Sequence, residues 1–332
     1  MFPLRNILPA AVYIPAFAVP ASLCLNFLTP LLFILFNAFQ AKPTDFMNAT
    51  RKIYRAGIIG IIILVFTTCT TIDIKEQDIF DIKRTISPEY FTQSELKLDQ
   101  VSFETNNDLR LNGWFITHPS ARGTVLFYGG NGFLKETAHG IIQSITDQQM
   151  NLFIFNYRGY GKNPGNPTIL GVKADGLAAY QYLVKVRNID PSKIIIHGHS
   201  LGTLVGLYVA ENNPAAGLVL ESPLTDAEHF TDEIVPKILR PFIQFNVDST
   251  LLEDSNIDRV SKIQVPLLIL VGKDDPITPP AMAKKLYRVA VSRDKRLMVL
   301  EDGNHNDLPN REDYQKIINN FYQKFIRPVA AL

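Results

Sequence analysis

The sequence predicts an α/β protein with a mostly parallel central sheet and helices on both of its faces. Short apolar runs alternate with helical patterns from residue 124 onward, and this alternation is typical of a parallel sheet between two helical layers. In addition, the apolar run 194–196 leads into Gly-His-Ser-Leu-Gly (198–202), and a small-residue helical pattern follows it. A strand, a sharp turn and a helix in this order are the setting of a nucleophile elbow.

The elements follow in a regular order after an opening hairpin. Residues 101–105 and 109–117 alternate in polarity around a polar turn at 106–108, which is a hairpin signal. Buried strands are then expected at residues 124–128, 152–156, 193–197, 217–221, 267–271 and 296–300. Helices are expected at residues 135–149, 171–186, 201–212, 280–291 and 312–325. Functional side chains are expected at the carboxyl ends of the strands, where ligands of such sheets bind.

The interval 223–263 interrupts this alternation of strands and helices, because it is helical or irregular and contains Pro236 and Pro241. It is either a small cap insertion that overhangs the strand ends or a plain connecting helix and loop. Its apolar side chains are either the lining of an acyl-chain pocket or ordinary core contacts: Ile234, Val235, Ile238, Leu239, Phe242, Ile243 and Phe245.

Composition excludes several classes of function. The chain has 332 residues, enough for one large α/β domain or two smaller ones. Its 33 basic and 32 acidic side chains nearly balance, and no basic stripe with interleaved aromatic residues is present, so a nucleic-acid partner is disfavoured. Both cysteines, Cys24 and Cys69, precede residue 73. The part after them therefore has no disulfide, no zinc-type cysteine cluster and no thiol nucleophile.

Two apolar segments open the chain. Residues 6–41 carry no charge and are long enough to span a bilayer, although four prolines interrupt them. Residues 47–55 are basic, residues 56–66 are apolar, and Thr-Thr-Cys (67–69) follows. A basic head, a short apolar core and small residues describe a secretory signal. The cysteine after them resembles that of a bacterial lipoprotein signal, in which it is lipidated, although Phe66 and Thr68 depart from the usual residues.

We therefore hypothesise that translation starts at Met47 and that Cys69 is lipidated. Residues 1–46 are then upstream read-through or an additional membrane span, and residues 47–72 are a signal. The alternative is two ordinary membrane-spanning helices joined by a basic loop. Positive charge stays cytoplasmic, so both alternatives place the rest of the chain on the extracytoplasmic, periplasmic side of a membrane. Residues 73–94 are then a tether or an opening strand, and residues 95–332 are the catalytic domain.

Candidate catalytic residues follow the predicted strands in the order serine, acid, histidine. Ser200 is the candidate nucleophile, and it needs a base and an orienting carboxylate. His305 follows the last apolar strand in a polar loop, whereas His229 lies in the irregular interval. Asp275 follows the strand 267–271 and is preferred to its neighbour Asp274, because it stands three residues after Gly272 and precedes Ile-Thr-Pro (277–279). Asp302 is too close in sequence to His305 to be its usual partner.

Backbone N–H groups are needed to stabilise the negative charge of a tetrahedral intermediate. Leu201, directly after the nucleophile and at a helix N-terminus, is one candidate donor. The second follows the strand 124–128, in Gly-Gly-Asn-Gly (129–132), where we choose Asn131 over the adjacent Gly130. A phosphate-binding loop is the competing interpretation, but no lysine follows at the required spacing.

With these motifs the chain resembles small serine hydrolases of the α/β-hydrolase superfamily, in its prolyl-oligopeptidase-related and depalmitoylase-like branch. The resemblance covers about residues 95–330 and is carried by five motifs in order: residues 128–132, 156–161, 198–202, 272–275 and 303–305. The family often has histidine where this chain has Gly129 and aspartate where it has Asn156. The first departure concerns the oxyanion loop, and the second concerns a structural turn.

The expected function is membrane-tethered hydrolysis of esters or thioesters through an acyl-enzyme, with neither a metal nor an organic cofactor. A serine peptidase or aminopeptidase would use the same residues. A non-catalytic binding protein with the same fold is the third alternative, and the intact set of Ser200, Asp275 and His305 argues against it.

Overall fold

The computed structural model describes residues 70–74, 95–226, 243–247 and 254–326. The chain divides into two compact units, residues 1–72 with 238–244 and residues 73–237 with 245–332. All the candidate catalytic and oxyanion residues belong to the second unit.

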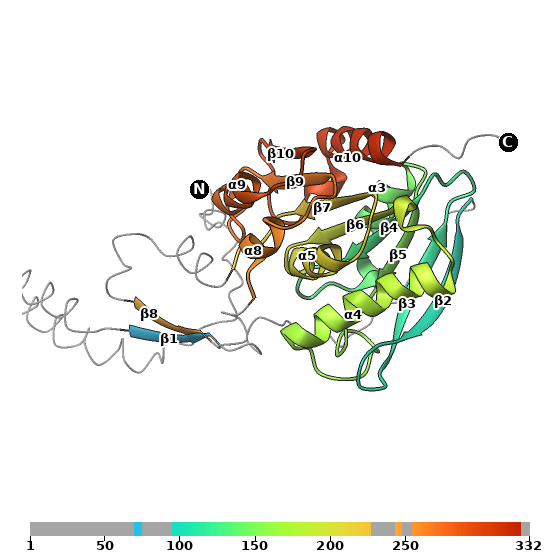
Figure 1. Ribbon diagram of the computed structural model, residues 1–332, viewed down its shortest axis with the longest axis horizontal. Coiled ribbons are helices and arrows are strands. Elements are labelled where there is room, and N and C mark those ends of the chain that lie inside the picture. The colour runs from blue at the N-terminus through green and yellow to red at the C-terminus, as the bar shows by residue number, and fades with distance from the viewer. Residues whose placement is uncertain (1–69, 75–94, 227–242, 248–253, 327–332) are drawn as a thin grey trace, which may run out of the picture. The chain divides into compact units, whose positions relative to one another are not determined.

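An eight-stranded sheet forms the centre of the second unit (Figure 1). Its strands are β2 (Lys97–Glu104), β3 (Arg110–Thr117), β4 (Thr124–Tyr128), β5 (Asn151–Phe155), β6 (Ile194–His199), β7 (Gly217–Glu221), β9 (Leu267–Gly272) and β10 (Lys295–Leu300). They lie in the order β10-β9-β7-β6-β4-β5-β3-β2, and only the pairs β2–β3 and β3–β5 are antiparallel. The prediction of a mostly parallel sheet is thus confirmed. A separate two-stranded sheet pairs β1 (Thr70–Ile74) with β8 (Ile243–Val247).

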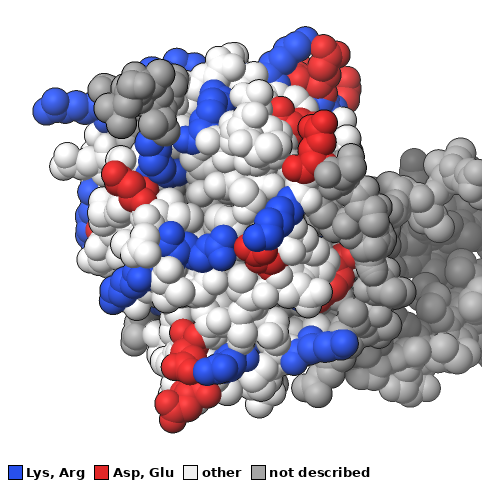
Figure 2. Space-filling model, turned by 90° about the vertical axis from the view of Figure 1, so that its right-hand side faces the viewer, with Lys and Arg blue, Asp and Glu red and all other residues white. Residues whose placement is uncertain are grey.

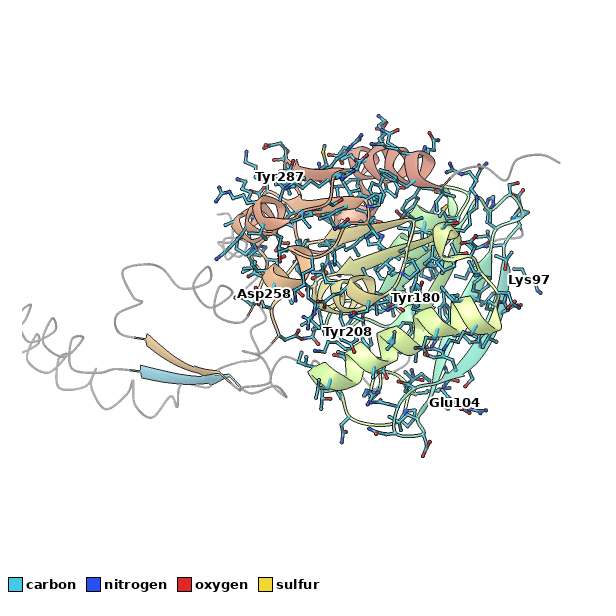
Figure 3. All side chains as sticks on the ribbon, viewed as in Figure 1. Lys97, Glu104, Tyr180, Tyr208, Asp258 and Tyr287 are labelled. Carbon is cyan, nitrogen blue, oxygen red and sulfur yellow. The ribbon has the colours of Figure 1, made fainter. Side chains whose placement is uncertain are left out.

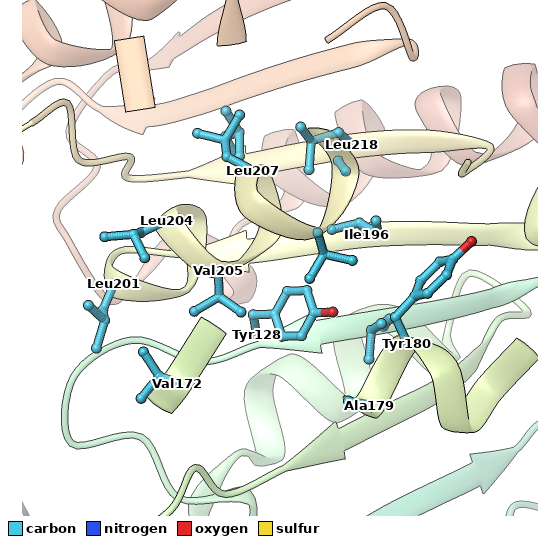
Figure 4. Packing of buried hydrophobic residues seen from close by; sticks show 14 of the residues in the cluster. Tyr128, Val172, Ala179, Tyr180, Ile196, Leu201, Leu204, Val205, Leu207 and Leu218 are labelled. Carbon is cyan, nitrogen blue, oxygen red and sulfur yellow. The ribbon is translucent and has the colours of Figure 1, made fainter. Parts of the chain in front are cut away.

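Helices cover both faces of the large sheet, as predicted. The α-helices are α3 (His139–Thr146), α4 (Ile169–Gln181), α5 (Leu201–Asn212), α8 (Asn256–Val260), α9 (Pro280–Val289) and α10 (Glu312–Phe325). Alternate strand residues enter two separate apolar clusters, because successive side chains of a strand point to opposite faces. One cluster packs against α4, α5 and α9, and the other packs against α3 and α10. Figure 4 shows the first of them, where Val205 of α5 lies near Tyr128 of β4.

Most predicted elements are found within two residues of their expected ends. The strand expected at 101–105 begins four residues earlier, at Lys97, and two helices also differ. The expected helix 135–149 is divided into a 3₁₀ turn (Lys135–Thr137) and α3, because Ala138 between them leaves the helical conformation at φ −88° and ψ 34°. The helix expected at 171–186 begins at Ile169, where the Thr168 hydroxyl caps it by accepting from the Gly171 N–H. It continues beyond Gln181 as a π-helical turn, Tyr182–Val186.

The two ends of the irregular interval 223–263 are tied to each other. Asn256 Nδ2 donates to the Leu224 carbonyl at 3.0 Å, and its backbone N–H donates to the Thr225 carbonyl at 3.3 Å. Lys173 forms a buried ion pair with Asp254 at 3.2 Å and lies over the ring of Tyr208, which projects from α5 (Figure 3). Residues 227–242 and 248–253 lie outside the described residues, so the choice between a cap and a connecting segment stays a prediction.

The membrane-related predictions concern residues that are mostly not described. Within the described ranges, no helix is long and apolar enough to cross a bilayer. Cys24, Cys69 and His229 lie outside these ranges. On the face that Figure 2 shows, basic and acidic side chains are interspersed, and neither sign forms a continuous field.

Candidate active site

The nucleophile elbow joins β6 to α5. Ser200 has φ 51° and ψ −118°, a strained conformation for a residue with a side chain, and its N–H donates to the Glu221 carbonyl at 2.9 Å. The flanking glycines are sterically required. A Cβ on Gly198 would lie 2.3 Å from the Gly202 carbonyl oxygen, and one on Gly202 would lie 2.0 Å from the Tyr128 carbonyl oxygen. The local sequence thus fixes a turn that presents the Ser200 side chain at the carboxyl end of β6.

The structure brings Ser200, His305 and Asp275 together, although they lie on three separate loops. His305 Nε2 is 3.0 Å from Ser200 Oγ, and His305 Nδ1 is 2.8 Å from Asp275 Oδ2. All three side chains are largely buried, with residue exposures of 3–8%. The loops meet because β6, β9 and β10 run in parallel and end at the same edge of the sheet. This hydrogen-bonded chain has the geometry that a serine nucleophile and its base require.

Asp275 is held by its own loop as well as by His305. Its Oδ1 accepts from the N–H groups of Ile277 and Thr278 at 2.9 and 2.8 Å, and its Oδ2 accepts from the Thr278 hydroxyl at 2.8 Å. Burial raises the pKa of Asp275, but the hydrogen bond and charge of His305, together with Thr278, outweigh burial and hold that pKa below its ordinary value of 3.8. The adjacent Asp274 is exposed, so it does not share this environment.

Thr278 is a site residue that sequence reasoning did not identify. Its hydroxyl lies 3.2 Å from His305 Nδ1 while it donates to Asp275. In the sequence, Ile-Thr-Pro (277–279) only supports the choice of Asp275 over Asp274. A threonine three residues after the acid, which places its hydroxyl beside that carboxylate, was the available signal.

Leu201 and the loop that contains Asn131 lie next to Ser200. Leu201 is the first residue of α5, so its N–H has no carbonyl partner within that helix. On the other side, a Cβ on Gly130 would lie 3.2 Å from Ser200 Cβ, which shows how closely this loop approaches the nucleophile. Asn131, the chosen donor, is exposed, and its side-chain Oδ1 accepts from the Tyr160 hydroxyl at 2.9 Å. That bond fixes the loop while leaving the role of the Asn131 N–H a prediction.

The two departures from the family pattern have local explanations. A Cβ on Gly129 would lie 2.2 Å from the ring of Phe133, so a histidine there would require Phe133 to move. Asn156 uses both ends of its amide, because Oδ1 accepts from the Lys135 N–H at 2.8 Å and Nδ2 donates to Glu136 at 2.9 Å. An aspartate has no N–H to offer Glu136, so asparagine suits this turn.

A second buried polar cluster lies beneath the elbow, and sequence reasoning missed it. The Glu221 carboxylate is 3.0 Å from His197 Nε2 and accepts from the Tyr314 hydroxyl at 2.7 Å. Burial raises the pKa of Glu221, but the hydrogen bond from His197 and the neighbouring histidines outweigh burial and keep that pKa below 4.5. Glu221 ends the strand next to β6, but its carboxylate bonds His197, and the carboxylate that bonds His305 is that of Asp275.

Comparisons with known proteins identify the fold family. Residues 125–247 match the family described as α/β hydrolase fold, and residues 232–312 match serine aminopeptidase, S33. An uncharacterised protein of Mycobacterium tuberculosis is 32% identical over 236 residues, covering 70% of this chain and 80% of that protein. The α/β-hydrolase domain-containing protein WAV2 of Arabidopsis thaliana is 29% identical over 248 residues, covering 68% and 79%.

Among solved structures, an esterase of Pyrococcus furiosus superposes with a TM-score of 0.59 at 20% identity, covering 74% of this chain and all of that one. At this identity the likeness concerns the fold. Taken with the family match and the 32% identical relative, it shows that the chain belongs to the α/β-hydrolase superfamily.

Proposed function

We propose that this chain is a serine hydrolase that cleaves esters or thioesters through an acyl-enzyme on Ser200. The observation that carries the proposal is the continuous chain from Ser200 Oγ through His305 to Asp275 Oδ2, with links of 3.0 and 2.8 Å. Because a carboxylate can only accept, His305 Nδ1 carries a proton and Nε2 is free to accept the serine proton.

The reaction follows from these positions. Ser200 Oγ attacks the substrate carbonyl carbon while its proton passes to His305 Nε2, and the carbonyl oxygen becomes an oxyanion that the N–H groups of Leu201 and Asn131 stabilise. The intermediate collapses, and the alkoxide or thiolate leaves with the proton from His305. Water then attacks the acyl-enzyme in the same way, which releases the acid and restores the Ser200 hydroxyl.

Hydrolysis of p-nitrophenyl esters of increasing acyl length tests this proposal. We expect turnover by the wild type and its loss in Ser200→Ala. The matched control is Ser222→Ala, since the buried Ser222 Oγ has no hydrogen-bond partner within the described part of the chain. Turnover that survives Ser200→Ala would refute the assignment of the nucleophile. Folded wild-type protein inert to the whole series would favour the non-catalytic binding protein instead.

Amide cleavage is the second candidate, and one observation favours it: residues 232–312 match the serine aminopeptidase family. The same Ser200, His305 and Asp275 would serve an amide. Parallel assays with matched p-nitrophenyl esters and aminoacyl p-nitroanilides separate the two, because a peptidase retains amide turnover at comparable kcat/KM.

We further propose that the enzyme is tethered to a membrane through residues preceding 73, with its catalytic domain on the periplasmic side. The support is sequence-based: the uncharged segments 6–41 and 56–66, the basic segment 47–55 and the Thr-Thr-Cys run ending at Cys69. One acyl chain binds a bilayer only marginally, so a lipoprotein anchor uses several.

A further inference from the structure

His199 precedes the nucleophile in the elbow and reaches toward the loop of the proposed base. Its Nε2 lies 3.0 Å from the His305 backbone carbonyl oxygen, and the two imidazole rings are 5.1 Å apart between centroids. A carbonyl oxygen can only accept a hydrogen bond, so His199 Nε2 carries the hydrogen and donates. The side chain next to Ser200 is therefore bonded to the backbone of His305.

The opposite side of the same ring faces the oxyanion loop. A Cβ on Gly130 would lie 2.9 Å from His199 Nδ1 and 3.2 Å from Ser200 Cβ. The His199 ring therefore lies at the meeting point of the elbow, the oxyanion loop and the His305 loop. Because Gly130 has no side chain, the loop can approach this ring closely.

His199 can donate from Nε2 whether its imidazole is neutral or charged. Burial lowers the pKa of His199 and so does the nearby His305, while Glu221 opposes them, and the net pKa lies below 6.5. His199 is therefore neutral at pH 7, and it does not place a second cation beside His305 when that base accepts the serine proton. The Nε2–H is present in either protonation state of a ring with this tautomer.

We infer that His199 is a positioning residue: its Nε2–H holds the His305 carbonyl, and through it the imidazole, in place against Ser200. This inference rests on the proposed function, because it concerns the geometry of the proposed base. A misplacement of about 1 Å at a reacting group can reduce a rate by about 100-fold, so one bond to this loop is enough to matter.

Two amide variants distinguish the effect of the Nε2–H hydrogen bond from the effect of the packing of the ring. The amide nitrogen of His199→Gln falls near the position of Nε2 and can still reach the His305 carbonyl, whereas that of His199→Asn falls near Nδ1 and cannot. With p-nitrophenyl butyrate we expect His199→Gln to retain most of the wild-type kcat. We expect His199→Asn to lose about 10- to 100-fold in kcat with little change in KM. Equal losses in the two folded variants, or no loss in either, would overturn the inference.

A second readout needs no substrate. Nitrogen-15 NMR of the imidazoles in the wild-type protein is expected to show His199 as the Nε2–H tautomer, and the Nδ1–H tautomer would overturn the inference. The His305 Nδ1 proton resonance is then compared between the variants, and it is expected to change in His199→Asn and to persist in His199→Gln. If the wild type cleaves no ester, the proposed function fails, while these spectra still decide the position of His199.

Discussion

At the end of β9, Asp274 and Asp275 are adjacent in sequence but differ in environment. Asp275 is 3% exposed and bonds to His305 and Thr278, whereas Asp274 faces solvent. Sequence alone favoured Asp275 through its spacing from Gly272. The structure adds the physical distinction, which is that one carboxylate is fixed by four hydrogen bonds and the other is not.

Asp275→Asn is expected to lower kcat by about 10³- to 10⁴-fold, because an amide donates toward His305 Nδ1 and favours the wrong tautomer. Asp274→Asn is the matched control, and it should stay close to the wild type. Steady-state kinetics on one ester decide between them. A large loss in Asp274→Asn with little loss in Asp275→Asn would mean that the acid is misassigned.

Acid is expected to destabilise the fold in two stages. The folded-state pKa of His199 lies below 6.5, so the unfolded chain binds this proton first as pH falls. The contribution of His199 to stability is therefore fully present well above pH 6.5 and declines as the pH falls through this value. Glu221 and Asp275 have folded-state pKa values below 4.5 and 3.8, so they add a second decline below those pH values. Urea unfolding across pH measures this, and His199→Gln should flatten the first stage. A free energy of unfolding that stays constant from pH 6.5 to 4 would contradict the assignment.

At the scale of elements, the β6–α5 elbow depends on the close approach of Gly202 to the backbone of Tyr128 in β4. Gly202→Ala would place a Cβ 2.0 Å from the Tyr128 carbonyl oxygen, a fixed backbone atom. We expect it to reduce the free energy of unfolding by about 3 kcal/mol or more. Gly206→Ala, one turn later in α5, would place a Cβ no closer than 3.3 Å to a neighbouring side chain, that of Ile196, and it improves helix propensity. Its effect should therefore stay within about 1 kcal/mol. Equal effects in denaturant unfolding would show that the elbow is not sterically constrained.

The sequence was sufficient to predict which loops meet, because each candidate residue directly follows an apolar run and parallel strands end at one edge of the sheet. The sequence was insufficient to predict contacts that depend on where a long side chain points. His199 lies in the elbow motif, but nothing in its spacing indicates a bond to the His305 carbonyl. For Thr278, the spacing of three residues from Asp275 is the one signal of its bond to that carboxylate. The short elements α8 and β8 were also missed, since five residues show no clear periodicity.

At the scale of the whole molecule, the unusual feature is the long apolar sequence ahead of the hydrolase domain. If Cys69 is the lipidated first residue of the mature protein, labelled palmitate should be incorporated and then lost in Cys69→Ser. Cys24→Ser should incorporate it normally, which makes it the matched control. The physical reason is that only the acylated cysteine holds the label covalently. Peptides from residues 1–46 in the mature protein, or labelling that persists in Cys69→Ser, would contradict this interpretation.

The central claim, that Ser200 is an activated nucleophile, is tested most directly by mapping the adduct of a fluorophosphonate probe. The His305 imidazole, 3.0 Å from Ser200 Oγ, should make this hydroxyl react covalently at neutral pH. Mass spectrometry of digested protein is expected to place the phosphonyl group on Ser200 alone, with no labelling of Ser200→Ala. An adduct on another serine, or folded wild-type protein that stays unlabelled, would contradict the claim.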